Sequence, residues 1–173
     1  MKTILSVFAA VLVSVSANAA GVSSGKYASV SNQEKTGQVG VGLAGGSLTG
    51  LSTQFWMDND RAINATFAAE HGNSAISVAH LWLFRGVFAV AGLEANYFVP
   101  YIGVGAIAAF GTQSDYFMRN NENVVAAAQV PLGIEFLPSL QRFDVFAELV
   151  PSLEITPTTV GFLTADLGAR FYF

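Results

Sequence analysis

Carboxylates and one arginine recur at even spacings near the end of the chain. Asp144 and Glu148 are four residues apart, as are Asp166 and Arg170. Because successive side chains of an extended strand point to opposite faces, residues an even number apart share a face. A guanidinium can bind carboxylates through two parallel hydrogen bonds. We therefore expect Arg170 to pair with Glu148 or Asp166, since buried charges must be paired or become neutral.

Other polar residues join this set by the same parity argument. The predicted polar network consists of Gln54, His80, Gln129, Glu135, Glu148, Asp166 and Arg170, with Asp144 and Glu154 nearer strand ends. The main interpretation is structural: these side chains fill a closed interior. The excess of carboxylates over cations leaves a second interpretation open, a narrow cation-preferring path or a proton-sensitive gate.

His80 is the member of this network that could act as a general base or as a pH sensor, because imidazole titrates near neutral pH. Ser77 lies on the opposite strand face from His80, so the two cannot pair directly. The sequence has no recognisable local motif that combines Ser, His and an acid. A lipid-modifying hydrolase is therefore a minor alternative. The chain also has no cysteine, and we expect neither a cofactor nor a metal site.

The elements that must position these residues are predicted to be β-strands. In the last segment, 161–173, apolar and small residues alternate with a second set that includes Asp166 and Arg170. Period-two alternation bounded by turn residues is typical of strands whose two faces meet different surroundings. The same pattern predicts seven further strands, over 38–44, 51–57, 62–70, 75–83, 98–110, 124–136 and 143–154.

The connections between these strands favour antiparallel order. Short turns at 45–49, 58–60 and 71–74 contain the Gly, Asn and Asp residues that turns prefer. The longest polar connection, 111–123, carries Tyr116, Phe117 and Arg119. Exposed aromatic residues beside an arginine are typical of contact surfaces. This loop is predicted to bind an extracellular partner, or to lie at the membrane interface with Arg119 on lipopolysaccharide phosphate.

The composition indicates that the apolar faces meet lipid. Hydrophobic residues make up 52% of the chain and charged residues only 12%, with a net charge of −4. No interior stretch approaches the ~20 apolar residues of a membrane helix. A transmembrane barrel spreads its apolar residues in this way, because lipid-facing and lumen-facing positions alternate. A soluble β-sandwich is the alternative, and the scattered basic residues give no nucleic-acid-binding stripe.

The N-terminus has the features of an export signal. Residues 1–20 contain Lys2, an apolar run over 4–15, and the small-x-small sequence Ala17-Asn18-Ala19, which together predict a cleaved signal peptide. A membrane anchor is less well supported because the apolar run is short. Residues 21–37 are polar and aperiodic, and are predicted to form a flexible periplasmic segment before a barrel over 38–173.

The final residues, Leu167-Gly168-Ala169-Arg170-Phe171-Tyr172-Phe173, resemble the C-terminal insertion signal of bacterial outer-membrane proteins. The resemblance implies recognition by the barrel-assembly machinery, with Gly168, Phe171 and Phe173 as the matching positions. More widely, Gly50-Leu51-Ser52 with Phe55-Trp56, and the segment 144–157, resemble a family of small outer-membrane barrels. That family is similar in architecture to the OmpA and OmpX transmembrane domains, and the resemblance brings no assigned chemistry.

These features predict an all-β fold: an eight-stranded, up-and-down antiparallel transmembrane β-barrel, integral to the bacterial outer membrane and in contact with its lipids. Eight strands give an interior that side chains can fill. The predicted function is non-enzymatic, in envelope integrity or surface interaction. A small cation-preferring pore and a lipid-modifying hydrolase are the alternatives.

Overall fold

The computed structural model describes residues 35–70, 73–87, 97–111, 124–137, 142–156 and 159–173. Nine strand segments lie within these ranges: β1 (Val39–Gly46), β2 (Gly50–Trp56), β3 (Arg61–Glu70), β4 (Asn73–Leu83), β5 (Phe98–Phe110), β6 (Val124–Gln129), β7 (Leu132–Phe136), β8 (Phe143–Thr156) and β9 (Gly161–Tyr172). No helix among the described residues is long and apolar enough to cross a membrane.

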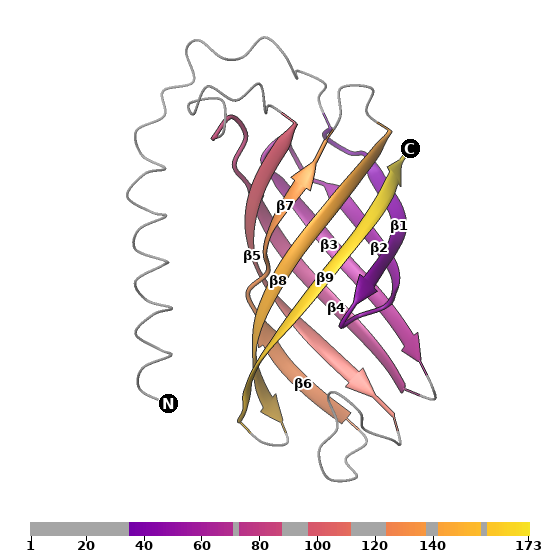
Figure 1. Ribbon diagram of the computed structural model, residues 1–173, viewed down its shortest axis with the longest axis vertical. Helices are drawn as coiled ribbons and strands as arrows, with labels where there is room; N and C mark the ends of the chain where they lie inside the picture. Colours follow the sequence, from indigo (N-terminus) through magenta and orange to yellow (C-terminus); the bar gives the residue numbers. More distant parts are fainter. Residues whose placement is uncertain (1–34, 71–72, 88–96, 112–123, 138–141, 157–158) are drawn as a thin grey trace. The chain divides into compact units, whose positions relative to one another are not determined.

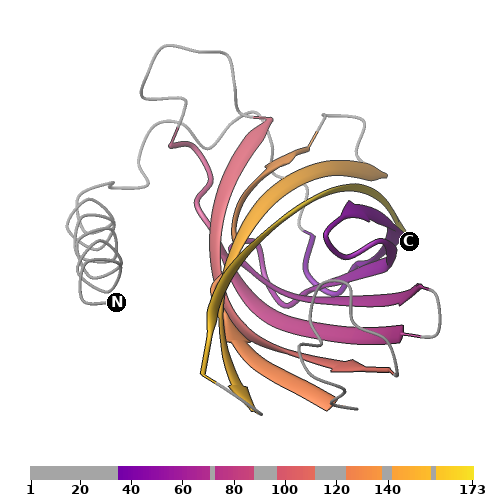
Figure 2. The same cartoon turned by 60° about the horizontal axis from the view of Figure 1, so that its bottom comes forward.

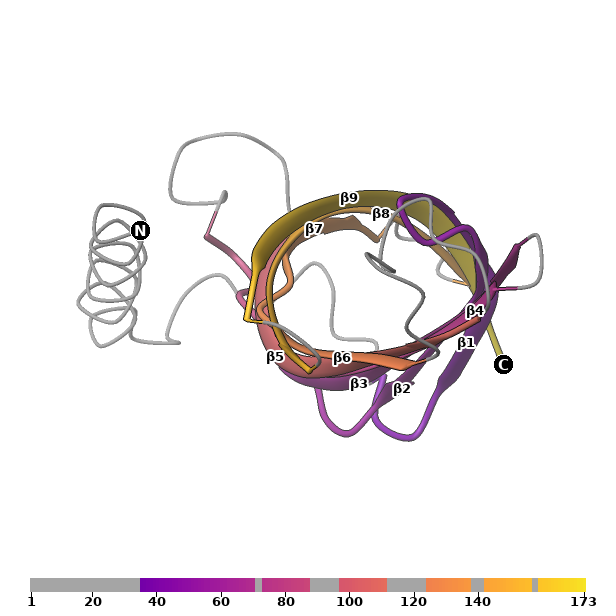
Figure 3. The ribbon, with the colours of Figure 1, turned by 90° about the horizontal axis from the view of Figure 1, so that it is seen from below.

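The strands form one closed antiparallel sheet. From β1 to β5, and for β8 with β9, consecutive strands pair; β6 and β7 both lie between β5 and β8, and β1 also pairs with β9, with Gly42 opposite Arg170. Figure 1 shows the tilted strands, and Figure 3 shows them as a ring. Because the first and last strands pair, the described sheet has no free edge, as a barrel in hydrocarbon requires.

Two of the nine segments, β6 and β7, occupy one strand position. Both pair with β5 on one side and with β8 on the other, and the register with β5 is the same before and after the break. The break falls at Val130-Pro131, because proline has no N–H to donate to the ladder. Hydrogen bonds from Gly103 N to Pro131 O (2.7 Å) and from Val130 N to Pro151 O (2.9 Å) bridge it. The barrel therefore has the eight strands that the sequence predicts.

The outer face of the barrel is apolar. Leu43, Val104, Leu149 and Leu167 point outward from four different strands, and each is at least half exposed in the isolated chain. In the described strands, the only charged side chain on this face is that of Arg61, at the start of β3. A face of this size and composition is stable against lipid and not against water. At about 3.3 Å per residue and a tilt of about 40°, a strand as long as β9 spans roughly 30 Å, enough for a bilayer core.

The two ends of the barrel differ. We call the end at which β1 begins and β9 ends the terminus end; it is uppermost in Figure 1. Aromatic side chains gather there on the outer face, where Phe98 packs against Phe136 (5.0 Å between ring centroids) and Phe171 against Phe173 (5.2 Å). Such girdles mark the level of lipid headgroups. β5 ends and β6 begins at the opposite end of the barrel, and most of the predicted long loop between them, residues 112–123, is outside the described ranges.

Candidate functional site in the barrel lumen

Lumen-facing side chains form three layers along the barrel axis. At the terminus end, charged residues lie within an apolar cluster that includes Trp56, Leu81 and Tyr172. The middle layer is polar and surrounds a small cavity. At the opposite end, small and branched apolar residues pack together, with Leu48 and Phe162 against them. Figure 2 shows the barrel with the opposite end turned forward. The charges of the lumen therefore fall into two sets, one within the terminus-end apolar cluster and one in the middle layer.

The charges of the terminus-end layer form an ionic cluster, which we define as Glu135, Asp144, Arg170 and Tyr172. The Arg170 guanidinium donates from Nη2 to Glu135 Oε1 (2.8 Å) and from Nε to Asp144 Oδ1 (3.1 Å) and Oδ2 (3.2 Å). The Tyr172 hydroxyl donates to Asp144 Oδ2. The side chains of Arg170, Glu135 and Asp144 are all inaccessible to solvent. One buried cation therefore joins strands β7, β8 and β9.

The predicted partners of Arg170 were wrong. Arg170 binds Glu135 and Asp144 instead of Glu148 or Asp166. The reason is the register of β8 against β9, which places Asp144 directly opposite Arg170 and Glu148 directly opposite Asp166. Alternation along one strand fixes which face a side chain is on, but it does not fix the level of the partner on the next strand.

Lys35, which precedes the first strand, closes the mouth at the terminus end. It lies in the predicted flexible segment 21–37, yet its residue is 5% exposed. Its ammonium lies 4.1 Å from the Tyr172 ring centroid and 5.3 Å from that of Trp56. On the other side, the Arg85 guanidinium lies 5.1 Å from the Trp56 ring. These are cation–π contacts, and they hold the end of the lead-in segment in the barrel mouth.

Because burial lowers the pKa of Lys35 from 10.5 to about 8, we expect a titration at that mouth. The nearby carboxylates of Asp144 and Glu135 oppose the shift, whereas Arg85 and Arg170 add to it. Between pH 8 and 10.5 the unfolded chain still holds a proton that folded Lys35 has released. Docking of this segment should therefore become more favourable as pH rises through that window.

The measurement is the emission of Trp56 in a Trp82→Phe background, which leaves a single tryptophan. Emission should change with a midpoint near pH 8. The same titration in a Lys35→Met variant should be flat, because Arg85 keeps its charge throughout. A midpoint that survives the Lys35→Met substitution would assign the change to another group.

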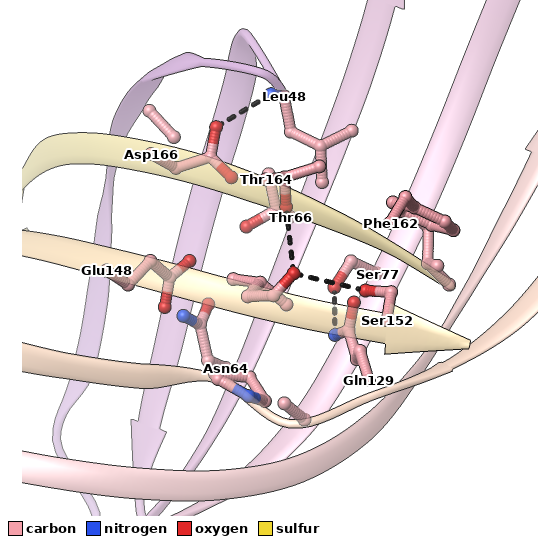
Figure 4. Close-up of a pocket in the computed structure, with 15 residues that line it drawn as sticks. Leu48, Asn64, Thr66, Ser77, Gln129, Glu148, Ser152, Phe162, Thr164 and Asp166 are labelled. Carbon is pink, nitrogen blue, oxygen red and sulfur yellow. Dashed lines mark hydrogen bonds between the residues drawn. The ribbon is translucent and has the colours of Figure 1, made fainter. Parts of the chain in front are cut away.

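The middle layer holds the remaining predicted network residues. Gln129 Nε2 donates to Ser77 Oγ (2.6 Å), and Tyr101 donates to Glu148 Oε2 (2.8 Å). Asp166 Oδ1 accepts from the backbone N–H of Leu48 (2.7 Å). These side chains surround a cavity of about 20 Å³ (Figure 4). Because one water molecule needs at least about 10–15 Å³ of such space, the cavity has room for one small molecule or ion.

The parity prediction placed six of the seven network residues correctly on the lumen face. Gln54, Gln129, Glu135, Asp166 and Arg170 are buried, and Glu148 lines the cavity. Gln54 lies beside Glu135, in the terminus-end layer. The network is divided between two layers, so it is not one continuous chain of contacts.

His80 was placed on the wrong face. It pairs with Ile63 on β3 and Val104 on β5, both of which point outward, and its ring packs against Trp82 at 4.5 Å. The lumen face of β4 is instead built from small and apolar residues and Ser77. No serine or acid neighbours His80 on the described outer face. This arrangement offers no support for a lipid hydrolase based on His80.

Other predicted residues lie at the strand end or outside the described ranges. Phe171 and Phe173 belong to the terminus-end girdle. Tyr116, Phe117 and Arg119, and the predicted signal peptide 1–20, lie outside the described residues. Among the described residues, no group of three or more His, Cys, Asp and Glu side chains is arranged to hold a metal ion.

Gly168 has a packing role that is independent of any assembly signal. A Cβ atom at this position would clash with the backbone oxygen of Leu43 and would lie 2.7 Å from Cε1 and Cζ of Phe146. The Phe146 ring in turn packs on the Arg170 guanidinium, 4.2 Å from its Cζ. Glycine therefore leaves the space that Phe146 occupies beneath the ionic cluster.

Gly168→Val is expected to destabilise the barrel by about 1–3 kcal/mol, because the extra atoms overpack this site. Urea unfolding in lipid vesicles measures the change. The double variant Gly168→Val/Phe146→Leu should lose less than the sum of the two single variants, because the smaller side chain relieves the part of the clash that involves the Phe146 ring, while the contact with the Leu43 backbone oxygen remains. Strictly additive losses would show that the two positions do not compete for one space.

Comparison with known proteins agrees with this architecture. No protein-family model and no curated protein matches the chain. Among solved structures, the N-terminal β-barrel domain of Pseudomonas aeruginosa OprF is similar, with a TM-score of 0.61 and 17% identity, over 82% of this chain and all of that domain. The Yersinia pestis outer membrane protein Ail gives a TM-score of 0.44 and 18% identity, over 79% of this chain and 97% of that one.

The similarity to the OprF domain shows the fold: an eight-stranded antiparallel β-barrel of the small outer-membrane type. The apolar outer face described above adds the physical reason why such a barrel lies in a membrane. Together these findings confirm the predicted fold class, and the apolar outer face fits a barrel surrounded by lipid.

Proposed function

We propose that this protein is a sealed, non-enzymatic barrel of the bacterial outer membrane that contributes to envelope integrity or presents its loops to a surface partner. The observation that carries the proposal is the closure of the lumen. The ionic cluster and Lys35 lie across the terminus end, and the cavity in the middle layer of the described residues has a volume of only about 20 Å³. A continuous water path needs far more room than one water molecule occupies.

The geometry supports a structural role over a catalytic one. Arg170 is engaged by two carboxylates and a ring, and Tyr172 is engaged by Asp144. Every charged group of this cluster is paired with an opposite charge, although Glu135 Oε2 and Arg170 Nη1 have no hydrogen-bond partner among the described residues. Buried paired networks of this kind rigidify an interior. The partner-binding part of the proposal rests on the predicted loop residues Tyr116, Phe117 and Arg119, and lipids remain the expected surroundings of the outer face.

The test is ion conductance across planar bilayers that contain the purified, folded protein. We expect no steady conductance from the wild-type protein. A variant in which both closing cations are shortened, Lys35→Ala/Arg170→Ala, should also show no steady conductance, because the apolar layer at the opposite end still fills the lumen. Folding of each sample is checked by the change in gel mobility on boiling.

Steady wild-type conductance would overturn the sealed-barrel proposal in favour of a cation-preferring pore. That second function is favoured by one observation, the pair of lumen carboxylates Glu148 and Asp166 beside the cavity. In that case Glu148→Gln should reduce the preference for cations over anions. Wild-type protein that gives no steady conductance at either sign of the applied voltage supports the sealed barrel.

A further inference from the structure

Two carboxylates lie side by side on neighbouring strands in the middle layer of the lumen, and neither has a basic partner among the residues that line the cavity. Glu148 on β8 lies directly opposite Asp166 on β9, and side chains so placed have Cβ atoms about 4.5–5.5 Å apart. Like charges in this position destabilise a sheet. The residues that line the cavity include no Lys, Arg or His. Arg170, the cation on the same strand, is already bound by Glu135 and Asp144.

A third oxygen points to a ligand at the same place. Asn64 on β3 lines the cavity and is 7% exposed, and its Oδ1 atom has no hydrogen-bond partner. Figure 4 shows its amide pointing into the cavity, on the side of the Glu148 carboxylate. A buried acceptor without a partner costs about 1–3 kcal/mol. A ligand that accepts electron pairs from oxygen would satisfy Asn64 and both carboxylates together.

The remaining lining residues offer more oxygen and no soft ligand. Thr66, Thr164 and Ser152 contribute hydroxyl groups around the cavity. Each carboxylate has about four lone-pair sites, so the single bonds that Tyr101 and Leu48 donate leave ligating capacity. An all-oxygen set with two negative charges, around a space of about 20 Å³, fits one small hard cation.

We propose that the lumen binds one calcium ion between Glu148 and Asp166, with Asn64 Oδ1 as a further ligand. Ca²⁺ takes six to eight oxygen ligands in flexible geometry, whereas Mg²⁺ demands a near-ideal octahedron and gives up its water reluctantly. The double charge of Ca²⁺ neutralises the facing carboxylates, which Na⁺ would leave with a net negative charge. The site lies between the two apolar layers and is separate from the ionic cluster.

The experiment measures calcium bound to the full, detergent-solubilised protein. Protein refolded in EDTA is dialysed against buffered Ca²⁺, and bound metal is determined by atomic emission, with folding checked by gel mobility. We expect close to one Ca²⁺ per chain. The double variant Glu148→Gln/Asp166→Asn should lose at least tenfold in affinity. Asp58→Asn, which removes an exposed carboxylate from the turn between β2 and β3, should bind as the wild type does.

A second variant keeps the test decisive if the double variant does not fold. Asn64→Ala retains both carboxylates and should weaken Ca²⁺ binding several-fold, while the Ca²⁺-dependent rise in the temperature of the gel-mobility change becomes smaller. Folded wild-type protein without bound calcium at millimolar Ca²⁺ would overturn the proposal. So would equal binding of Mg²⁺, or calcium binding that survives both the double variant and Asn64→Ala.

Discussion

Replacing Arg170 with methionine is expected to lower the free energy of unfolding by about 3–5 kcal/mol, the range for removing one partner from a buried ion pair. The substitution leaves the carboxylates of Glu135 and Asp144 buried, with side chains that no solvent reaches. Neither can be solvated without opening the terminus end. Urea unfolding in lipid vesicles, followed by tryptophan emission, measures the loss.

The matched control is Arg61→Met. Arg61 pairs with Asp58 through an equally short contact, 2.6 Å, but its side chain is 54% exposed. Exposed pairs contribute little to stability because water competes for both charges, so the midpoint should hardly move. The triple variant Arg170→Met/Glu135→Gln/Asp144→Asn also removes the two unpaired carboxylates, and should recover part of the lost free energy of unfolding. If the triple variant were less stable than Arg170→Met, the cost would come from packing and not from uncompensated charge.

The second large effect is expected on the outer face. Val104 lies at the middle of β5 and is 51% exposed in the isolated chain. On a water-facing surface, Val104→Arg would change stability by no more than about 0.5 kcal/mol. In a bilayer the same substitution puts a guanidinium near the midplane, and should destabilise the folded barrel by about 2–4 kcal/mol.

Val124 provides the control. It has the same side chain and a similar exposed fraction of 48%, but it is the first residue of β6 and so lies at the edge of the barrel wall. Val124→Arg should cost at most about 1 kcal/mol, since arginine near the interface reaches the headgroups. Reversible unfolding in vesicles of one lipid measures both variants. Equal and small losses at the two positions would place the outer face in water.

The alternation of side chains was enough to predict most of the fold and half of the site. In β8 and β9, every charged residue lies on one face and the other face is entirely apolar, so their orientation could be assigned before any contact was known. The break between β6 and β7 could not be predicted, because Pro131 interrupts the ladder without changing the alternation.

His80 and Lys35 show where this reasoning ends. In β4 the lumen face carries Ala79 and Leu81 while the outer face carries His80 and Trp82. The alternation in β4 therefore does not separate a polar face from an apolar face. The assumption that a polar side chain points inward assigned His80 to the wrong face. Lys35 lies in a segment with no period, and nothing local distinguishes it from the other polar residues there. Its burial depends on Trp56 and Tyr172, which lie on strands far along the chain.

The pairing of β1 with β9 also bears on how this chain reaches its folded state. One edge of the first strand pairs with β2 and the other edge pairs only with the last strand, so the backbone groups along that second edge stay unpaired until the C-terminal segment has been synthesised. A nascent chain would expose two unpaired borders, which invite association with other chains. Pairings so distant in sequence are slow to form. Ring closure is therefore a late step, and a chain truncated before Gly161 should be a substrate for proteolysis instead of a smaller barrel.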